Sequence, residues 1–435
     1  MGKNNFRKIA AITLFESAVQ WYCFLLYGTA AGTVFHKVFF SQTGNGTTAL
    51  ILSYMSFAIG YIAGPFGAIF FGHIGDRKGR KVTMYASLLM MGISTSIIGI
   101  LPSAASAGVG VVIVLQLMRL AQCFGRGGTW GGGILMAYEN VPENKRSFYA
   151  AIPQIGLPIG FGLSSILIAV PTLLLPEDIF FTWGWRIPFL AAIILTLIVI
   201  RQKGEMMETE DYKKAQAKLE AEEAEGKKHK VGFIPMVKGY WKTLLLGCGT
   251  RWVDGTFYNI FIVWILSYCI NWLGMPLIQT YIITIIACIF KIPFTLFGGW
   301  CAQKLGNTRT FVIGALASAV LSIPTLKVIE LSKGNLAITI IGIVLGWSIA
   351  YNLIWAVISS LWSSYFETEV RYSGISFVYH VPSFLVAGMV PTICTLLINY
   401  GKGDTIYVGI YSTVVALISA ACALALKARH DRGEK

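Results

Sequence analysis

Charged side chains are scarce in this chain of 435 residues. Only 13% of the residues are Asp, Glu, Lys or Arg, whereas 55% are hydrophobic. Soluble domains carry about 25% charged residues, so the composition argues against a soluble protein and favours one that crosses a membrane many times. The net charge is +14, but the cations gather in short connections on one side of the expected membrane. We therefore expect no nucleic-acid partner.

Cysteines are also few, and their spacing matches neither a metal site nor a disulfide framework, so we interpret them as small residues of an apolar core. We recognise no nucleophile–base pair, metal cluster or phosphate-binding loop. The sequence therefore predicts neither an enzyme nor a cofactor. Basic residues precede the first apolar run, but no small-residue cleavage site follows it, which favours a first transmembrane helix over a cleaved signal peptide.

Long apolar runs account for most of the chain. Crossing the hydrocarbon core takes about 18 residues or more, and twelve runs meet this length. The sequence predicts an all-α polytopic membrane protein with transmembrane helices at 9–35, 47–71, 82–101, 109–138, 148–175, 181–200, 243–270, 277–301, 310–329, 336–362, 372–399 and 406–426.

The connections between these runs differ in charge. Connections 102–108 and 271–276 carry no cation, and 171–180 carries only two acidic residues. The alternate connections are basic, and because cytoplasmic loops are enriched in Lys and Arg, we place both termini in the cytoplasm of a bacterial-type cell. The basic residues that fix this orientation are Arg77, Lys78, Arg80, Lys81, Lys145, Arg146, Lys304, Arg309 and Arg371.

One polar, mixed-charge stretch, 201–242, divides the chain into a predicted N-terminal bundle (1–200) and a C-terminal bundle with a short cytoplasmic tail (243–435). We interpret this stretch as a partly helical cytoplasmic linker, and a regulatory role remains open.

Two motifs recur across the linker. GHIGDRKGRK at 72–81 is echoed at 299–309, where Gln303 takes the place of Asp76. ENVPENKR, which ends at Arg146, is echoed by ETEVR, which ends at Arg371. The two offsets are 227 and 225 residues. A shared offset indicates duplicated halves, that is, two pseudo-symmetric bundles of six helices.

The first of these motifs resembles the cytoplasmic signature of the major facilitator superfamily. Five further stretches resemble, in the same order, those of its metabolite:proton symporter family, which includes transporters of proline/betaine, shikimate, citrate and 2-oxoglutarate. The resemblance implies the major facilitator fold and secondary transport of a small polar metabolite, often with protons. The stretches are QWYCFLLYG at 20–28, RLAQCFGRGGTWGGG at 119–133, YENVPENKRSFYAAIPQIGLPIG at 138–160, WGWRIPFL at 183–190 and FETEVRYSGIS at 366–376.

Three acidic positions of the family pattern are not acidic here. Gln20 and Cys23 stand where the first helix would read E-W-Y-D-F, and Thr129 stands where the fourth would read G-G-E-W-G-G. Glu16 lies one turn before Gln20 on the same helix face, and Arg126 lies within the fourth-helix motif. Coupling to protons must therefore use other residues or be absent.

Ionisable residues within the spans are functional candidates, because each costs about 2.5–3.5 kcal/mol on insertion scales. With His380 neutral, four cations (Arg119, Arg126, Arg251, Lys291) face two acids (Glu16, Asp254). A bound anion would balance the two excess positive charges. Because arginine binds a carboxylate through two parallel hydrogen bonds, we expect a carboxylate substrate with more than one acidic group.

These observations assign roles to named residues. Substrate binding is expected at Gln20, Trp21, Tyr22, Arg119, Arg126, Trp130, Tyr258, Asn259, Lys291 and Tyr379. Proton coupling is expected at Glu16, Asp254 and His380. Gating is expected at Asp76, Arg77, Arg80, Glu139, Arg146 and Arg371.

Some of these roles have alternatives. Arg119 and Arg251 also fit a structural role, and Arg251 can pair with Asp254 at i,i+3. Glu16 and Arg126 are candidates for a pair that a proton or substrate breaks. His380 can titrate near neutral pH or remain a neutral, hydrogen-bonded core residue.

The leading hypothesis is a secondary active transporter that moves a small organic anion by alternating access, with proton symport. A uniporter or exchanger is the nearest alternative. A zwitterion such as a betaine also fits, because aromatic rings can hold its cationic end. A sensor that kept the fold but lost transport is a further alternative. The expected partners are the substrate, protons and the lipid bilayer, and we expect a monomer.

Overall fold

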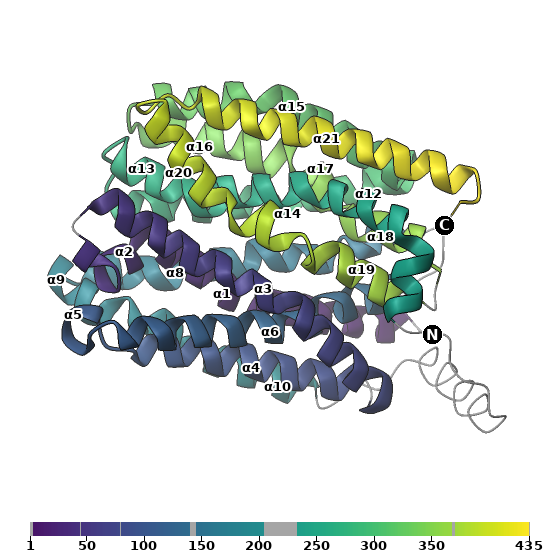
Figure 1. Ribbon diagram of the computed structural model, residues 1–435, viewed down its shortest axis with the longest axis horizontal. Coiled ribbons are helices and arrows are strands. Elements are labelled where there is room, and N and C mark those ends of the chain that lie inside the picture. Colours follow the sequence, from purple (N-terminus) through teal and green to yellow (C-terminus); the bar gives the residue numbers. More distant parts are fainter. Residues whose placement is uncertain are drawn as a thin grey trace.

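The computed structural model describes residues 3–43, 45–78, 80–139, 145–203, 233–367 and 370–434, and their regular structure is entirely helical (Figure 1). A helical segment lies at each of the twelve predicted spans, which confirms the all-α polytopic fold. Ten of the described segments are long and apolar enough to cross a membrane. Helices suit this environment because they satisfy every backbone hydrogen bond internally.

The first six segments are α1 (Lys3–Thr33), α3 (Gly46–Lys78), α4 (Arg80–Ile100), α6 (Gly110–Glu139), the run α7, η3 and α8 (Arg146–Ala150, Pro153–Ile155, Gly156–Leu174), and the run α9, η4 and α10 (Glu177–Ile179, Phe180–Gly184, Arg186–Lys203). Short elements α2 (Phe35–Val38), η1 (Ser41–Thr43) and α5 (Ala104–Ala107) lie in the connections.

The last six are the run α12, η5 and α13 (Phe233–Asn259, Ile260–Trp264, Ile265–Asn271), α14 (Leu277–Leu305), α15 (Asn307–Leu331), the run α16, η6, α17 and α18 (Leu336–Ile343, Val344–Ala350, Asn352–Trp355, Ile358–Tyr365), the run α19, η7 and α20 (Arg371–His380, Phe384–Gly388, Val390–Tyr400), and α21 (Ile406–Asp431).

Neighbouring helices pack mainly within each set of six. In the first set α6 packs against α3 and α4, and α1 packs against α8; in the second, α21 packs against α12 and α15. The two sets meet where α14 packs against α8 and where η7 packs against α3. In Figure 1, α4, α6 and α10 lie at one edge of the molecule and α15 and α21 at the opposite edge. The two-bundle division stays a prediction, and residues 204–232 of its linker lie outside the described part of the chain.

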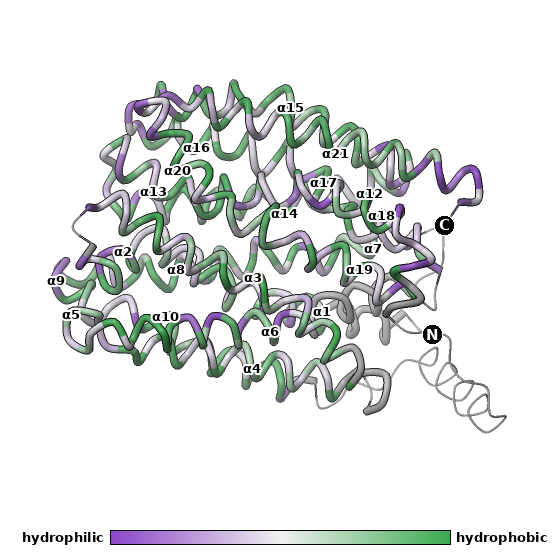
Figure 2. The backbone as a smooth tube through the Cα atoms, viewed as in Figure 1, coloured by the Kyte–Doolittle hydropathy of each residue, from purple (hydrophilic) through white to green (hydrophobic). Residues whose placement is uncertain are grey.

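Hydropathy follows the helices as a membrane requires. Figure 2 shows hydrophobic residues along most of the helical length, with hydrophilic residues gathered near helix ends and at scattered interior positions. Interior polar positions matter most for function, because lipid offers their side chains no hydrogen-bond partner.

Four of the described helical runs contain a π-helical turn. η5, η6 and η7 interrupt the predicted spans 243–270, 336–362 and 372–399, and η4 lies at the start of the predicted span 181–200. The predicted spans 243–270, 336–362 and 372–399 each still correspond to one continuous apolar helical run. A π turn accommodates one extra residue without altering the apolar character of the run, so hydropathy does not reveal it.

Helices α3 and α6 approach closely at two glycines. A Cβ at Gly67 would lie 1.9 Å from the carbonyl oxygen of Phe124, and a Cβ at Gly127 would lie 2.4 Å from the backbone nitrogen of Ala68. Small residues at such crossings let transmembrane backbones touch.

We therefore expect Gly67→Ala to lower the free energy of unfolding by about 1–3 kcal/mol, because the new methyl group forces the two backbones apart. Thermal unfolding of the detergent-purified protein measures the effect. Gly46→Ala is the matched control at the start of the same helix, where no heavy atom would lie within 4 Å of the new Cβ. Equal unfolding temperatures for both variants would contradict the expected close crossing.

Candidate functional site

A buried ion pair lies on α12. Arg251 donates to Asp254, three residues later, and each side chain is 2% exposed. This confirms the predicted local pairing. The second oxygen of Asp254 accepts a hydrogen bond from the hydroxyl of Tyr351, between η6 and α17. The carboxylate therefore has a cationic and a neutral partner, which allows its charge to stay buried.

The ring of Tyr379 connects this pair to Arg126 of α6. The guanidinium carbon of Arg251 lies 4.4 Å from the centre of the Tyr379 ring. Arg126 Nη2 donates to the Tyr379 hydroxyl at 2.5 Å. The contact joins two residues 253 positions apart, one from each predicted half.

Arg126 is enclosed by aromatic rings and by no acid. Its guanidinium carbon lies 3.7 Å from the centre of the Phe24 ring and 4.7 Å from that of Trp21. The side chain is 3% exposed, and its Nε has no hydrogen-bond partner. The described residues provide no ion pair to it. Cation–π contacts offset part of the desolvation cost, but none of the described side chains is a counter-ion for the charge.

Lys291 of α14 lies at the other end of the same series of contacts. Its Nζ donates to Asn352 Oδ1 at 3.0 Å and to the carbonyl of Trp347 at 3.4 Å. It also lies 4.4 Å from the centre of the Tyr351 ring. Tyr351 thus contacts Asp254 through its hydroxyl and Lys291 through its ring.

We call the set Arg126, Tyr379, Arg251, Asp254, Tyr351 and Lys291 the charge network. It joins α6 of the first predicted half to helices of the second. With Lys291 protonated, three cations face one carboxylate, so the network carries two excess positive charges in a buried setting. Such charges are costly unless a ligand or a change of protonation state removes them.

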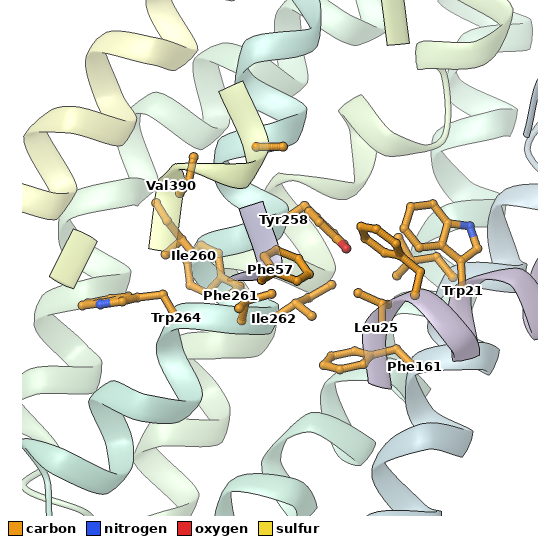
Figure 3. Packing of buried hydrophobic residues seen from close by; sticks show 14 of the residues in the cluster. Trp21, Leu25, Phe57, Phe161, Tyr258, Ile260, Phe261, Ile262, Trp264 and Val390 are labelled. Atoms are coloured by element: carbon orange, nitrogen blue, oxygen red, sulfur yellow. The ribbon is translucent and has the colours of Figure 1, made fainter. Parts of the chain in front are cut away.

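Aromatic side chains form a wall beside Arg126. Trp21 of α1 contacts the rings of Tyr258 and Trp355, with ring centres 5.8 Å and 5.4 Å away. Figure 3 shows Trp21 and Tyr258 within the same cluster of buried side chains. The indole nitrogen of Trp21 and the hydroxyl of Tyr258 have no hydrogen-bond partner. Two predicted binding residues of this wall therefore keep donor groups without a hydrogen-bond partner.

Gln20 and Asn259, two predicted substrate-binding residues with amide side chains, are buried. Each is the sequence neighbour of a residue in the aromatic wall. Gln20 precedes Trp21, and its Nε2 has no hydrogen-bond partner. Asn259 follows Tyr258 and donates from Nδ2 to the carbonyl of Gly255 at 2.8 Å, which leaves its Oδ1 without a partner. Their roles in substrate binding stay predictions.

Arg119 and Tyr22 have structural partners. The Nε and Nη2 of Arg119 each lie 3.4 Å from the carbonyl oxygen of Phe57, and Nη1 donates to Gln122. Three rings surround its guanidinium at 4.4–4.6 Å, those of Phe24, Tyr27 and Phe57. The hydroxyl of Tyr22 donates to the carbonyl of Pro188 at 2.5 Å. These contacts favour the structural alternative for Arg119.

The predicted coupling residues Glu16 and His380 are both buried. The His380 ring packs edge-on against Tyr379, with ring centres 4.9 Å apart, and its Nε2 has no hydrogen-bond partner. A Cβ at Gly64 would lie 2.8 Å from His380 Nδ1, so α3 confines the imidazole. The Glu16–Arg126 pair stays a prediction.

Of the predicted gating residues, the structure describes the side chains of Arg146 and Arg371. Arg371 Nε donates to the carbonyls of Ser363 and Phe366 at 3.0 Å and 3.2 Å, which places a cation at the C-terminal end of α18, as helix dipoles favour. Arg146 is half-buried at the start of α7. The side chains of the other gating candidates, Asp76, Arg77, Arg80 and Glu139, lie outside the part of the chain that the structure describes. The side chain of Trp130, a predicted binding residue, lies outside it as well.

Direct hydrogen bonds also join the two predicted halves on either side of the network. Tyr54 donates to Ser267 Oγ at 2.6 Å, and Tyr281 donates to Thr33 Oγ1 at 3.1 Å. Elsewhere Trp355 Nε1 donates to the carbonyl of Gln154 at 2.9 Å, and Gln154 Nε2 donates to that of Trp355 at 3.2 Å.

Sequence reasoning missed Tyr351, the residue that connects Asp254 to Lys291. A tyrosine within an apolar run is usually a packing residue, and its only signal was its position beside Asn352. Gln154 lay within a motif used for the family resemblance, but nothing in its spacing predicted a partner on α17.

A family model described as the Major Facilitator Superfamily matches residues 10–391. The chain belongs to the major facilitator superfamily. Relatives of this facilitator include an inner membrane metabolite transport protein, YhjE, of Escherichia coli K12, which is 33% identical with 98% of this chain and 96% of the relative covered. A shikimate transporter of the same organism is 32% identical, with 96% and 94% covered.

A proline/betaine transporter of Salmonella typhimurium is 27% identical to this facilitator, with 98% and 84% covered. Among solved structures, the xylose transporter XylE from E. coli in a partially occluded inward open conformation superposes with a TM-score of 0.72 at 15% identity, covering 96% of both chains. That likeness shows the same fold. The protein is thus a metabolite transporter of the cytoplasmic membrane and not an enzyme.

Proposed function

We propose that the protein is a secondary active transporter that moves a small carboxylate-bearing organic anion by alternating access, with proton symport. One observation carries the proposal: the charge network is buried between helices of both predicted halves and has two excess positive charges. A ligand that enters this network is surrounded by groups from both halves, as alternating access around a midplane site requires.

The geometry of Arg126 supports a carboxylate. A guanidinium presents a planar set of donors that matches two carboxylate oxygens, and Nε of Arg126 is without a partner. The indole nitrogen of Trp21 and the hydroxyl of Tyr258, in the aromatic wall, also lack hydrogen-bond partners. Three donor groups that lack acceptors favour a ligand rich in oxygen acceptors.

A betaine-type zwitterion is a less favoured ligand at this position. Its quaternary ammonium needs the face of an aromatic ring, yet the rings of Phe24 and Trp21 already face the guanidinium of Arg126. A second cation placed there would repel the first. The carboxylate end of a zwitterion would still fit Arg126.

Proton coupling follows from the energetics of moving an anion. Each negative charge that enters a cell with a negative interior costs about 2.3 kcal/mol per 100 mV. A proton carried in the same cycle cancels this cost. The resemblance to the metabolite:proton symporter family supports the same coupling. A uniporter would leave the anion at its electrochemical equilibrium, and an exchanger would tie its gradient to that of the counter-substrate.

Uptake into proteoliposomes tests the proposal. The probes are radiolabelled mono- and dicarboxylates together with glycine betaine and proline, each measured with and without an inward proton gradient. We expect one carboxylate to accumulate above its equilibrium level only with the gradient. Preferred accumulation of a betaine would contradict the substrate class, and equilibration without accumulation would contradict symport.

A further inference from the structure

Lys291 differs from the other cations of the charge network in its partners. The side chain is fully enclosed, at 0% exposure. Arg251 has the carboxylate of Asp254, whereas Lys291 contacts only neutral groups: an amide oxygen, a backbone carbonyl and the rings of Trp347 and Tyr351. The described residues offer it no ion pair. Its direct partners therefore stabilise the charged form through dipoles and rings and not through an ion pair.

The amide of Asn352 is oriented toward Lys291 by other hydrogen bonds. Asn352 Nδ2 donates to the backbone carbonyl of Lys291 at 2.8 Å, and Thr295 Oγ1 donates to Asn352 Oδ1 at 3.1 Å. Asn352 Oδ1 therefore accepts from Lys291 in either protonation state, since a neutral amine keeps N–H groups to donate. The lysine need not move when its proton leaves.

Arginine cannot release a proton in a protein. Of the three cations in the charge network, only Lys291 can therefore change its charge during a transport cycle. Removing its proton also removes one of the two excess charges when no substrate is present, which lowers the cost of burial.

The ionisable groups around Lys291 provide no direct ion pair to its charge among the described residues. Tyr351 faces it directly, Asp254 lies one contact further, and Cys288 precedes it by one turn. α8, η3, α16, η6 and α17 also pack against α14 and have no Asp, Glu, His, Lys, Arg, Cys or Tyr. The remaining ionisable groups on the described helices that pack against α14 are Arg146 and Tyr149 of α7, Tyr268 and Cys269 of α13, and Arg309, Lys327 and Glu330 of α15.

The site also borders the contact between the two predicted halves. Trp347, whose carbonyl and ring both contact Lys291, packs edge-on against Phe161 of α8 at 6.0 Å between ring centres. Movement of α8 relative to α14 would therefore alter the surroundings of Lys291. Alternating access requires such a change at a residue that takes up a proton on one side and releases it on the other.

We propose that Lys291 carries the transported proton. This inference rests on the proposed symport of an anion. The substrate carboxylate binds while Lys291 is an ammonium, and the two charges cross the membrane together. After the carboxylate leaves, the ammonium gives up its proton to water, and the empty transporter returns with a neutral amine. One proton then accompanies each substrate molecule, so transport of a monocarboxylate is electroneutral.

Two transport measurements on reconstituted Lys291→Gln test this role. Gradient-driven accumulation reports coupling, and exchange of labelled for unlabelled substrate at equal pH reports binding and helix movement. We expect accumulation to fall to the equilibrium level, while exchange at saturating substrate, where weaker binding no longer limits the rate, stays within about threefold of wild type. Cys288→Ala, one turn away on the same helix, is the matched control and should accumulate substrate as wild type does.

Proton uptake by the wild-type protein gives a readout that needs no variant to fold. In weakly buffered detergent solution at neutral pH, substrate binding should take up close to one proton per protein. Lys291→Arg, which keeps a permanent charge, should bind substrate without this uptake. Wild-type binding without proton uptake would overturn the inference.

Other outcomes separate this inference from the proposed function. Gradient-driven accumulation by Lys291→Gln would overturn Lys291 as the proton carrier while leaving symport intact. Loss of both exchange and accumulation in Lys291→Gln would show instead that Lys291 is a substrate ligand. A wild-type protein that only equilibrates its substrate would overturn symport itself, and this inference with it.

Discussion

Replacing Arg126 by glutamine is expected to weaken binding of the transported anion by about 10- to 150-fold. Hydrogen bonds to charged groups contribute about 1.5–3 kcal/mol, and Arg126 is a buried guanidinium without an acidic partner among the described residues. Glutamine keeps a hydrogen-bonding side chain but removes the charge. Equilibrium binding to the purified protein, with the carboxylate that the uptake panel identifies, measures the change in Kd.

Two further variants separate charge from geometry. Arg126→Lys keeps the charge but loses the planar donor set, so its affinity should fall between those of the wild type and Arg126→Gln. Arg119→Gln removes a buried arginine seven residues earlier on the same helix. The guanidinium of Arg119 already donates hydrogen bonds to the Phe57 carbonyl and to Gln122. It should reduce stability more than affinity. An unchanged Kd for Arg126→Gln would contradict the proposed binding site.

Asp254→Asn is expected to destabilise the folded protein by about 3–5 kcal/mol. Asp254 is the one described carboxylate paired with Arg251, and breaking a buried ion pair leaves the remaining charge without compensation. The Tyr351 hydroxyl retains an oxygen acceptor on asparagine, so the loss falls mainly on Arg251. Denaturant unfolding in detergent, followed by tryptophan fluorescence, measures the change.

The double variant Asp254→Asn/Arg251→Gln identifies the cause. Because it removes both charges, it should recover part of the stability that Asp254→Asn loses, and the two single effects should not add. A double variant less stable than Asp254→Asn would show that Arg251 contributes through packing and not through its pair.

The sequence predicted the fold well, and the site only where contacts are local. The spans follow from hydropathy because lipid accepts few polar side chains. The Arg251–Asp254 pair was predictable because residues at i and i+3 of a helix are neighbours regardless of the rest of the structure. The list of buried charges was also available from the sequence.

The partners of the other charges were not predictable. Arg126 and Tyr379 are 253 residues apart, and Lys291 and Asn352 are 61 apart. Such contacts depend on how each helix is rotated about its axis, and a helix that is apolar on all sides gives no hydrophobic face from which to infer that rotation. The enclosure of Arg119 by three rings and the role of Tyr351 depend on the same rotations.

The reciprocal hydrogen bonds between Gln154 and Trp355 have a consequence for how the two predicted halves separate. Each residue donates a side-chain hydrogen bond to the backbone carbonyl of the other, so separating them leaves two donors and two carbonyls without partners. Apolar surroundings cannot satisfy these groups, and each unsatisfied group costs about 1–3 kcal/mol. Only water can take their place. Opening of this contact is therefore a hydration step, and its rate should depend on the activity of water as well as on the substrate.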